Sequence, residues 1–342
     1  MIKKECFTAE WIEQVSSELH YNDKNLIEKV IRALSLLEML VKAGCPLVFK
    51  GGTALMLILG KSAHRLSIDI DLICPPGTNI EDYLKSFADF GFINLELVER
   101  KQRDDADIPK SHSKFFYQIA YRNDTDAQSY ILLDVLYEDI HYFRTQQIAI
   151  DCPFIRLEGK PLMVTVPSAE DILGDKLTAF APNTTGIPYY RNGRSCSMEI
   201  AKQLYDVGRL FENVSDLQIT KEAFRKIAVV ELSYRSFGTD IGQVFNDIRQ
   251  TALCISTRGK AGEGDFDLIQ DGIIRVKSFM YKQRYLIDHA IIDAARAAYL
   301  ATLIEKGINE IESYSNNPAD IKDMVIRPSL PNKLNKLRSN LP

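Results

Sequence analysis

Apolar and polar positions alternate with a helical period at the start of the chain. Residues 8–19 and 23–43 place apolar side chains three and four positions apart, which predicts two amphipathic helices. Gly44 favours the end of the second helix, because glycine adopts the left-handed conformation of a helix C-terminus without a steric penalty. We therefore expect two helices before the first strand.

Short apolar runs bounded by turn residues then predict strands. These runs are residues 46–49, 68–74, 92–100, 115–122, 130–137 and 163–166. A helix is expected near 79–90, and the interval 101–112, rich in Lys, Arg and Asp, has the composition of an exposed loop. The first half of the chain thus combines helices with strands.

Helical periodicity dominates the rest of the chain. Helices are predicted at 168–181, at 198–212 and through most of 220–313, with a break at 259–264. Ser168 with Asp171 three positions later resembles a capping box, and Pro182 ends that helix. This part of the chain is expected to be mainly α-helical.

The interval 183–197 is predicted to be a long loop between two of these helices. It carries Tyr189 and Tyr190 beside Arg191 and Arg194. Tyrosines can stack a nucleic-acid base and arginines can hold phosphates, whereas an ordinary mobile linker is an equally good interpretation.

The composition is that of an ordinary globular protein, with 46% hydrophobic and 26% charged residues, which excludes wholesale disorder. The net charge of −4 argues against coating a nucleic acid non-specifically but allows a local basic groove. The six cysteines form no C-x-x-C pair and read as reduced thiols. No run reaches the ~18 apolar residues of a membrane span. We expect a cytoplasmic protein of two domains, with no membrane partner.

The most informative stretch joins a glycine pair to two closely spaced carboxylates. Gly51 and Gly52 follow the first strand, and Thr53 is predicted to cap the next helix, whose free N–H groups would face a ligand. Asp69 and Asp71 lie two positions apart in a strand and therefore on one face. Side by side they are destabilising unless a cation such as Mg²⁺ joins them. A solvated loop is the alternative for an isolated Asp-x-Asp pair.

A third carboxylate, Asp134, lies in the otherwise apolar strand 130–137. An ionised aspartate in such surroundings is unfavourable unless it meets a cation, so Asp134 is the candidate third metal ligand. The alternative is an aspartate at a strand end that accepts hydrogen bonds from a turn.

Four motifs, in this order, resemble those of the AbiEii/AbiGii toxin nucleotidyltransferases, a branch of the DNA polymerase β-like superfamily. They are Lys50-Gly51-Gly52-Thr53-Ala54-Leu55, Arg65-x-Ser67-x-Asp69-x-Asp71, Lys176-Leu177-x-Ala179 and Lys202-x-x-Tyr205-Asp206. The resemblance spans roughly residues 46–212. The chain departs from the family at Gln203, where relatives often carry a second acid, and at Ile68, where relatives carry a polar residue.

The resemblance implies an α+β fold with a polymerase β-like domain and a mixed sheet. The expected divisions are a nucleotidyltransferase domain at 1–166, a mainly helical domain at 167–325, and a basic, flexible tail at 326–342. The resemblance also implies an NTP substrate, two Mg²⁺ ions, and a toxin encoded beside a cognate antitoxin. Better understood members resemble tRNA nucleotidyltransferases, so the 3′ end of tRNA is the expected acceptor.

In the expected reaction an acceptor hydroxyl attacks the α-phosphate of the NTP and pyrophosphate leaves. Asp69 and Asp71 would hold the two Mg²⁺ ions, and Asp134 would complete the second site and accept the acceptor's proton. Asp206 would orient Lys176 or a substrate hydroxyl, and Arg65 would either bind the NTP or brace its loop. The residues expected to bind the NTP are Gly51, Gly52, Thr53, Arg65, Ser67 and Lys176.

Other classes of function are compatible with this sequence. The enzyme could nucleotidylate a small molecule or a protein, or the fold could serve as a non-catalytic nucleotide- or RNA-binding module. Three repelling carboxylates kept together argue against the module. Lys176 and Asp206 could also be solvated residues on helix surfaces, with no catalytic role.

Overall fold

The computed structural model describes residues 1–98, 110–121, 127–214, 216–235, 238, 240–312 and 317. The chain divides into unit 1, Met1–Ser168 with Ser278–Arg284, and unit 2, Ala169–Lys277 with Tyr285–Pro342. The range 167–325 was predicted to be one continuous domain, whereas Ser278–Arg284 belongs to unit 1. The predicted tail, 326–342, lies outside the described residues.

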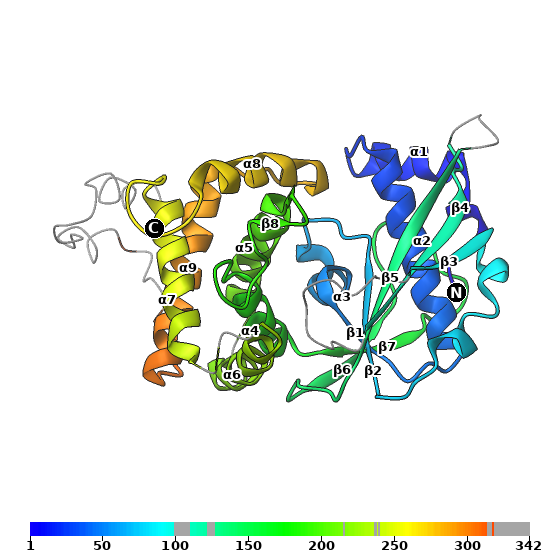
Figure 1. The fold of residues 1–342 in the computed structure, drawn as a ribbon. Coiled ribbons are helices and arrows are strands. Elements are labelled where there is room, and N and C mark those ends of the chain that lie inside the picture. The colour runs from blue at the N-terminus through cyan, green and yellow to red at the C-terminus, as the bar shows by residue number, and fades with distance from the viewer. Residues whose placement is uncertain are drawn as a thin grey trace. The chain divides into compact units, whose positions relative to one another are not determined.

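Unit 1 is built on a five-stranded sheet with the order β1-β2-β5-β4-β3 (Figure 1). Its strands are β1 (Val48–Lys50), β2 (Ile70–Cys74), β3 (Asn94–Val98), β4 (Lys110–Gln118) and β5 (Gln128–Tyr137). β2 and β5 run parallel and the other neighbours antiparallel, which confirms the expected mixed sheet. A separate pair joins β6 (Thr145–Ala149), which was not predicted, to β7 (Met163–Pro167).

The predicted N-terminal helices are α1 (Ala9–Glu18) and α2 (Lys24–Lys42), and α2 packs on one face of the sheet. Alternate residues of β4 and β5, such as Phe115 and Leu133, point into the core that α2 shares. The residues between them, including His112 and Asp134, are half-buried on the opposite face. This opposite face carries most of the polar side chains of the sheet.

Two predictions in unit 1 were wrong. Residues 79–90 form two 3₁₀-helices, Ile80–Tyr83 and Phe87–Phe90, because their apolar residues three positions apart suit a three-residue turn as well as an α-helix. Strand β4 begins at Lys110, so the end of the interval assigned to a loop is part of the sheet. Residues 101–109 lie outside the described part of the chain.

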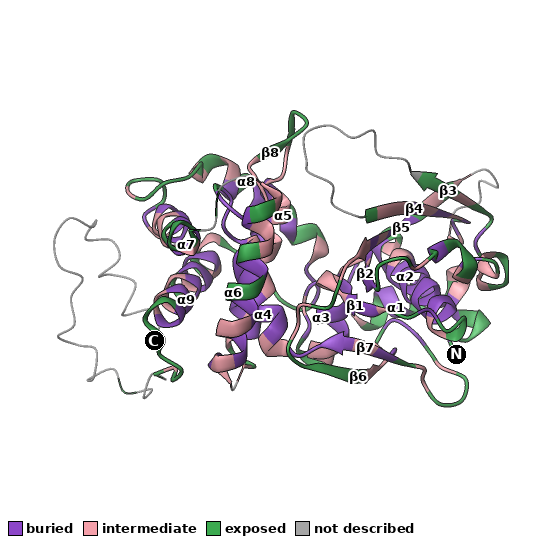
Figure 2. Cartoon of the chain, turned by 60° about the horizontal axis from the view of Figure 1, so that its bottom comes forward, coloured by how far each residue is buried: buried purple, intermediate pink, exposed green. Residues whose placement is uncertain are grey.

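Unit 2 consists mainly of helices, as expected for the C-terminal part. They are α4 (Ala169–Ala179), α5 (Ser197–Phe211), α6 (Leu217–Tyr234), α7 (Ile241–Ser256), α8 (Phe266–Val276) and α9 (Ile287–Lys306). α4 packs against α5 and α6, and α9 packs against α5 and α7, with their buried faces toward each other (Figure 2). Among the described residues no helix is long and apolar enough to cross a membrane. All six cysteines are free thiols.

The interval 183–197, predicted to be a loop, contains a β-hairpin. β8 (Tyr190–Arg191) pairs with β9 (Arg194–Ser195). Asn192 and Gly193 between them have φ angles of 51° and 73°, the left-handed conformation of a two-residue type I′ turn. The Asn-Gly pair was the sequence signal for this hairpin.

Candidate active site

A sharp turn joins β1 to α3 (Gly51–Leu59) at the start of the candidate site. The N-cap is Lys50, so the prediction that Thr53 caps the helix was wrong: Gly51, with φ 79°, begins the helix earlier. The Thr53 hydroxyl instead donates a 2.7 Å hydrogen bond to the backbone oxygen of Asp69. Thr53 thereby ties the first turn of α3 to the segment that precedes β2.

The two glycines lie directly beneath polar side chains of the candidate site. A Cβ on Gly51 would lie 2.0 Å from Oδ2 of Asp71. A Cβ on Gly52 would lie 2.6 Å from Oγ of Ser67 and 2.9 Å from Nη2 of Arg65. Only glycine leaves room for these groups, and the bare backbone lets a phosphate approach the N–H groups at the start of α3.

Arg65 is buried and is held by the segment Ser278–Arg284, which returns to unit 1. Its Nη1 donates a 3.0 Å hydrogen bond to the backbone oxygen of Leu66. Arg65 also forms a β-bridge with Met280, and the Leu66 N–H donates to Phe279 O at 2.8 Å. These contacts fit the expectation that Arg65 braces its loop.

Asp71 and Asp134 are paired across the parallel strands β2 and β5, so their side chains share one face of the sheet. Asp69 lies just before β2, which begins at Ile70, rather than inside the strand as predicted. Oδ1 of Asp134 contacts Nδ1 of His112, its partner in register on β4. No group of three or more His, Cys, Asp or Glu side chains in the described part of the chain is placed to hold a metal ion.

His112 is the site residue that sequence reasoning missed. Its side chain is largely buried, and its Nε2 has no hydrogen-bond partner among the residues that the structure describes. The interval before residue 113 was assigned to a loop because the side chains of β4 on this face are polar and leave no apolar run. The stretch Ser111-His112-Ser113-Lys114 has no alternating apolar residue, so no hydrophobic signal marked His112.

Lysine side chains of α2 and β4 also bring positive charge to unit 1. Burial lowers the pKa of Lys29 on α2, and the negative charge of Asp69 opposes that shift. Lys29 Nζ and Lys114 Nζ each lie 5.5 Å from the ring centroid of Tyr130 on β5. The charge of Lys29 is therefore partly balanced by that of Asp69.

Within unit 2, Lys176 of α4 and Asp206 of α5 form a buried ion pair. Lys176 Nζ lies 3.1 Å from Asp206 Oδ2, and the two side chains are 9% and 2% exposed. Lys176 also donates a 3.0 Å hydrogen bond to Oε1 of Gln203, one turn before Asp206. The alternative that both residues are solvated on helix surfaces is therefore wrong, and Gln203 supplies an acceptor where relatives often carry an acid.

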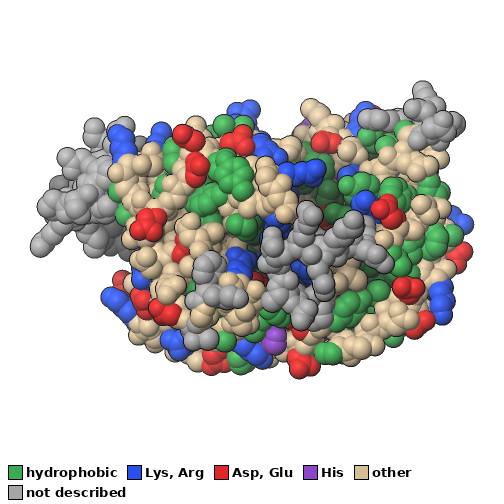
Figure 3. Space-filling view, in the orientation of Figure 1, with side chains coloured by type: hydrophobic (Ala, Val, Ile, Leu, Met, Phe, Trp, Pro, Cys, Tyr) green, Lys and Arg blue, Asp and Glu red, His purple; other side chains and the backbone are tan. Residues whose placement is uncertain are grey.

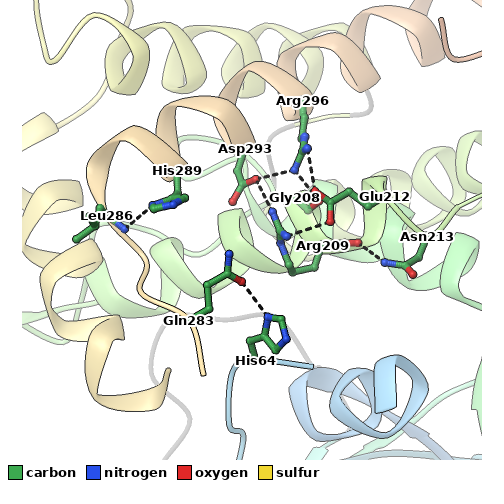
Figure 4. A network of polar contacts seen from close by, with 10 residues as sticks. All are labelled: His64, Gly208, Arg209, Glu212, Asn213, Gln283, Leu286, His289, Asp293 and Arg296. Carbon is green, nitrogen blue, oxygen red and sulfur yellow. Dashed lines mark hydrogen bonds and ion pairs between the residues drawn. The ribbon is translucent and has the colours of Figure 1, made fainter. Parts of the chain in front are cut away.

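A charged network joins α5 to α9 (Figure 4). Asp293 of α9 is 1% exposed and lies 3.5 Å from Arg209 Nη2 and 3.2 Å from Arg296 Nη1. Glu212 pairs with the same two arginines at 3.0 Å and 2.9 Å. Burial raises the pKa of Asp293 to about 6, although the guanidinium groups oppose that shift. The network fixes the helix that carries Asp206.

A glycine turn before a helix, in-register carboxylates on a mixed sheet and a following helical unit are features of a nucleotidyltransferase. A family model described as "Nucleotidyl transferase AbiEii toxin, Type IV TA system" matches residues 34–308, and the chain belongs to this family. The resemblance read from the motifs is thereby confirmed. The protein is a nucleotidyltransferase toxin of a type IV toxin–antitoxin system, and the family implies an NTP substrate and an antitoxin partner.

Solved structures with a similar arrangement include JHP933 from Helicobacter pylori, at 17% identity and a TM-score of 0.44. That match covers 82% of this chain and 94% of the other. MenT4, a nucleotidyltransferase toxin from Mycobacterium tuberculosis, matches at 10% identity and a TM-score of 0.46, covering 96% of this chain and 98% of the other. No curated protein matches the sequence.

Proposed function

We propose that this toxin transfers a nucleoside monophosphate from an NTP to an acceptor hydroxyl in a Mg²⁺-dependent reaction in the cytoplasm, and that the acceptor is the 3′ end of tRNA. The observation that carries the proposal is the convergence of Asp71 with the glycine turn and with Asp134 on one face of the sheet. The family supports the nucleotidyl transfer itself. The acceptor follows from the resemblance to tRNA nucleotidyltransferases.

The donor set of the site fits Mg²⁺. Asp71 and Asp134 present hard carboxylate oxygens from neighbouring strands, and Asp69 is one residue outside β2. Like charges directly opposite on a sheet are destabilising, and a cation between them removes the penalty. Mg²⁺ takes one or two carboxylates and completes its shell with waters and substrate phosphates, so three preassembled protein ligands are not required. When bound, it would neutralise negative charge that develops on the triphosphate.

The residues of the chain would supply binding and proton transfer. The backbone N–H groups of Gly51 and Gly52, together with the Ser67 hydroxyl, would bind phosphate oxygens. Asp134, held by His112, would accept the proton of the acceptor hydroxyl. Correct placement and charge compensation account for most of the rate in such a reaction.

Lys176 would add a fixed positive charge for the triphosphate. An ammonium has three N–H donors, and Asp206 and Gln203 accept two of them. The remaining donor would be available to an anionic ligand, while Asp206 holds the side chain in place. This division gives Asp206 a positioning role and Lys176 a binding role.

The test is incubation of the protein with α-labelled NTPs, Mg²⁺ and either total tRNA, total protein or aminoglycosides. Label that enters tRNA alone supports the proposal. Label in protein or in an aminoglycoside would reassign the acceptor, and no transfer to any of them would favour a binding module. Each outcome thus selects one class of function.

Growth arrest provides a matched test in cells. Induction of the wild-type chain without its antitoxin should arrest growth, and Asp69→Ala or Lys176→Ala should relieve the arrest. The matched controls Asp82→Ala and Lys221→Ala remove a carboxylate and an ammonium that lie on the surface, and should remain toxic. Equal arrest by the Asp69 variant would count against catalysis as the cause.

A further inference from the structure

The β8–β9 hairpin of unit 2 is exposed, and the transfer site described above does not use it. Tyr190 is 57% exposed, and Arg191 and Arg194 are exposed beside it (Figure 2). Basic and acidic side chains are interspersed among the described residues on the face drawn in Figure 3. A nucleic acid would therefore need a local binding element, and this hairpin combines an aromatic ring with two cations.

The two arginines are placed where they repel each other. Arg191 and Arg194 are directly opposite across the hairpin, next to its turn. Like charges at such positions destabilise a β-ribbon. In the described part of the chain, neither arginine forms an ion pair with an acidic side chain. Binding an anion between or beside them would remove the repulsion.

The hairpin is anchored at its base. The Cys196 N–H donates a 2.9 Å hydrogen bond to the Tyr189 backbone oxygen, which closes the ribbon. The Tyr189 side chain points inward: a Cβ on Gly264 would lie 2.5 Å from its hydroxyl oxygen, and burial raises the pKa of Tyr189 to about 12. With a type I′ turn at the tip and the half-buried Tyr189 at the base, Tyr190 is held exposed before any ligand binds, which reduces the entropy lost on binding.

We propose that this hairpin binds single-stranded nucleic acid, with Tyr190 stacking on a base and Arg191 and Arg194 contacting phosphates. Adjacent positions of a ribbon face opposite sides, so the strand would pass over the edge of the hairpin. Stacking requires an unpaired base, which favours a single strand over a duplex. Guanidinium groups suit phosphates because they can donate two parallel hydrogen bonds. The identity of that strand as the acceptor RNA rests on the proposed function.

The test is fluorescence anisotropy in the absence of NTP, with a labelled single-stranded RNA of mixed sequence. An RNA of about 12 nucleotides is long enough for one such site. Tyr190→Ala should weaken binding roughly tenfold or more, and Tyr190→Phe should retain it because the ring remains. Arg191→Ala with Arg194→Ala should reduce the slope of log K against log salt by about 1.4, which corresponds to two phosphate contacts.

The matched control is Lys260→Ala with Lys277→Ala, which removes the same charge from other exposed positions of unit 2. It should leave affinity and salt slope close to those of the wild type. Far-ultraviolet circular dichroism should show that every variant is folded. A labelled RNA duplex of the same sequence should bind without dependence on Tyr190.

Failure of the wild type to bind the RNA, or equal binding by wild type and hairpin variants, would overturn the proposal. Variants that keep RNA affinity but lose co-purification with the antitoxin would assign the hairpin to a protein partner, which also overturns it. The assay contains no NTP and is independent of catalysis. Hairpin variants that bind RNA normally and still transfer label into tRNA would overturn only this inference. The proposed function would remain supported.

Discussion

Replacing Gly51 by alanine should abolish most transfer activity while the protein remains folded. The new Cβ would lie 2.0 Å from Oδ2 of Asp71, and real Cβ atoms essentially never approach an atom closer than 3.0 Å. The carboxylate must therefore move by about 1 Å or more. A displacement of ~1 Å at a reacting centre lowers the rate about 10²-fold, because the groups no longer meet in a productive geometry.

Gly44→Ala is the matched control. Gly44 has φ 75°, close to the 79° of Gly51, but nothing lies within 4 Å of its Cβ position. Both variants carry the penalty of a left-handed alanine, about 1–2 kcal/mol, and each should lower the Tm by a few degrees. Only Gly51→Ala displaces Asp71, so a difference in activity between the two variants isolates that contact.

Single-turnover transfer of labelled nucleotide into total tRNA, together with thermal unfolding, would measure both effects. Activity of Gly51→Ala within about threefold of Gly44→Ala, at equal Tm, would show that the position of Asp71 over the turn has no part in the reaction, since a 1 Å shift should cost far more. Partial loss in both variants by the same factor would lead to the same conclusion. The reasoning that places the phosphates over Gly51 would then be refuted.

Three further predictions concern buried charges. Lys176→Met and Asp206→Leu should each lower the free energy of unfolding by about 3–5 kcal/mol, because each removes one partner of a buried ion pair. The double variant should lose less than the sum in urea unfolding, and additive losses would contradict the ion pair. His112→Phe should lower kcat roughly ten- to a hundredfold by releasing Asp134, with little change in Tm, and an unchanged kcat would exclude a positioning role. Folding raises the pKa of Asp293 from 3.8 to about 6. The protonated carboxyl therefore stabilises the fold by up to ~3 kcal/mol below about pH 4. This contribution is lost as the pH rises through 6. In Asp293→Asn the midpoint of urea unfolding should depend less on pH between about pH 4 and 6. A pH dependence equal to that of the wild type would assign the effect to other groups.

The sequence alone was sufficient to predict the site residues that interrupt an apolar run. Asp71 and Asp134 stand out in strands that are otherwise apolar, and the period of two places each of them on the polar face. The glycine pair was equally readable, because few other residues could follow a strand so closely into a helix. Helical periodicity likewise predicted the C-terminal helices.

The hydrophobic periodicity of the sequence could not predict features that depend on a polar strand face, on backbone pairing or on the packing of helices. Strand β4 has a polar face, so its first residues, including His112, read as a loop. The pairing of the segment 278–284 with residues 64–66 uses backbone hydrogen bonds, which no hydrophobic pattern reveals. The burial of Lys176 and Asp206 depends on the packing of α4 on α5, and residue spacing alone leaves a helix surface equally acceptable.

Because the segment Ser278–Arg284 returns to unit 1 late in the sequence, unit 1 cannot complete its core until late in synthesis on the ribosome. Tyr281 of that segment is buried in the core of unit 1 and packs edge-on against Phe154, with ring centroids 5.3 Å apart. A nascent chain that has passed Ser168 still needs more than a hundred residues before this ring emerges, on the order of ten seconds of translation. Translation that stops before this segment yields a sheet whose core lacks Tyr281, so full toxicity should require a chain that extends past Arg284.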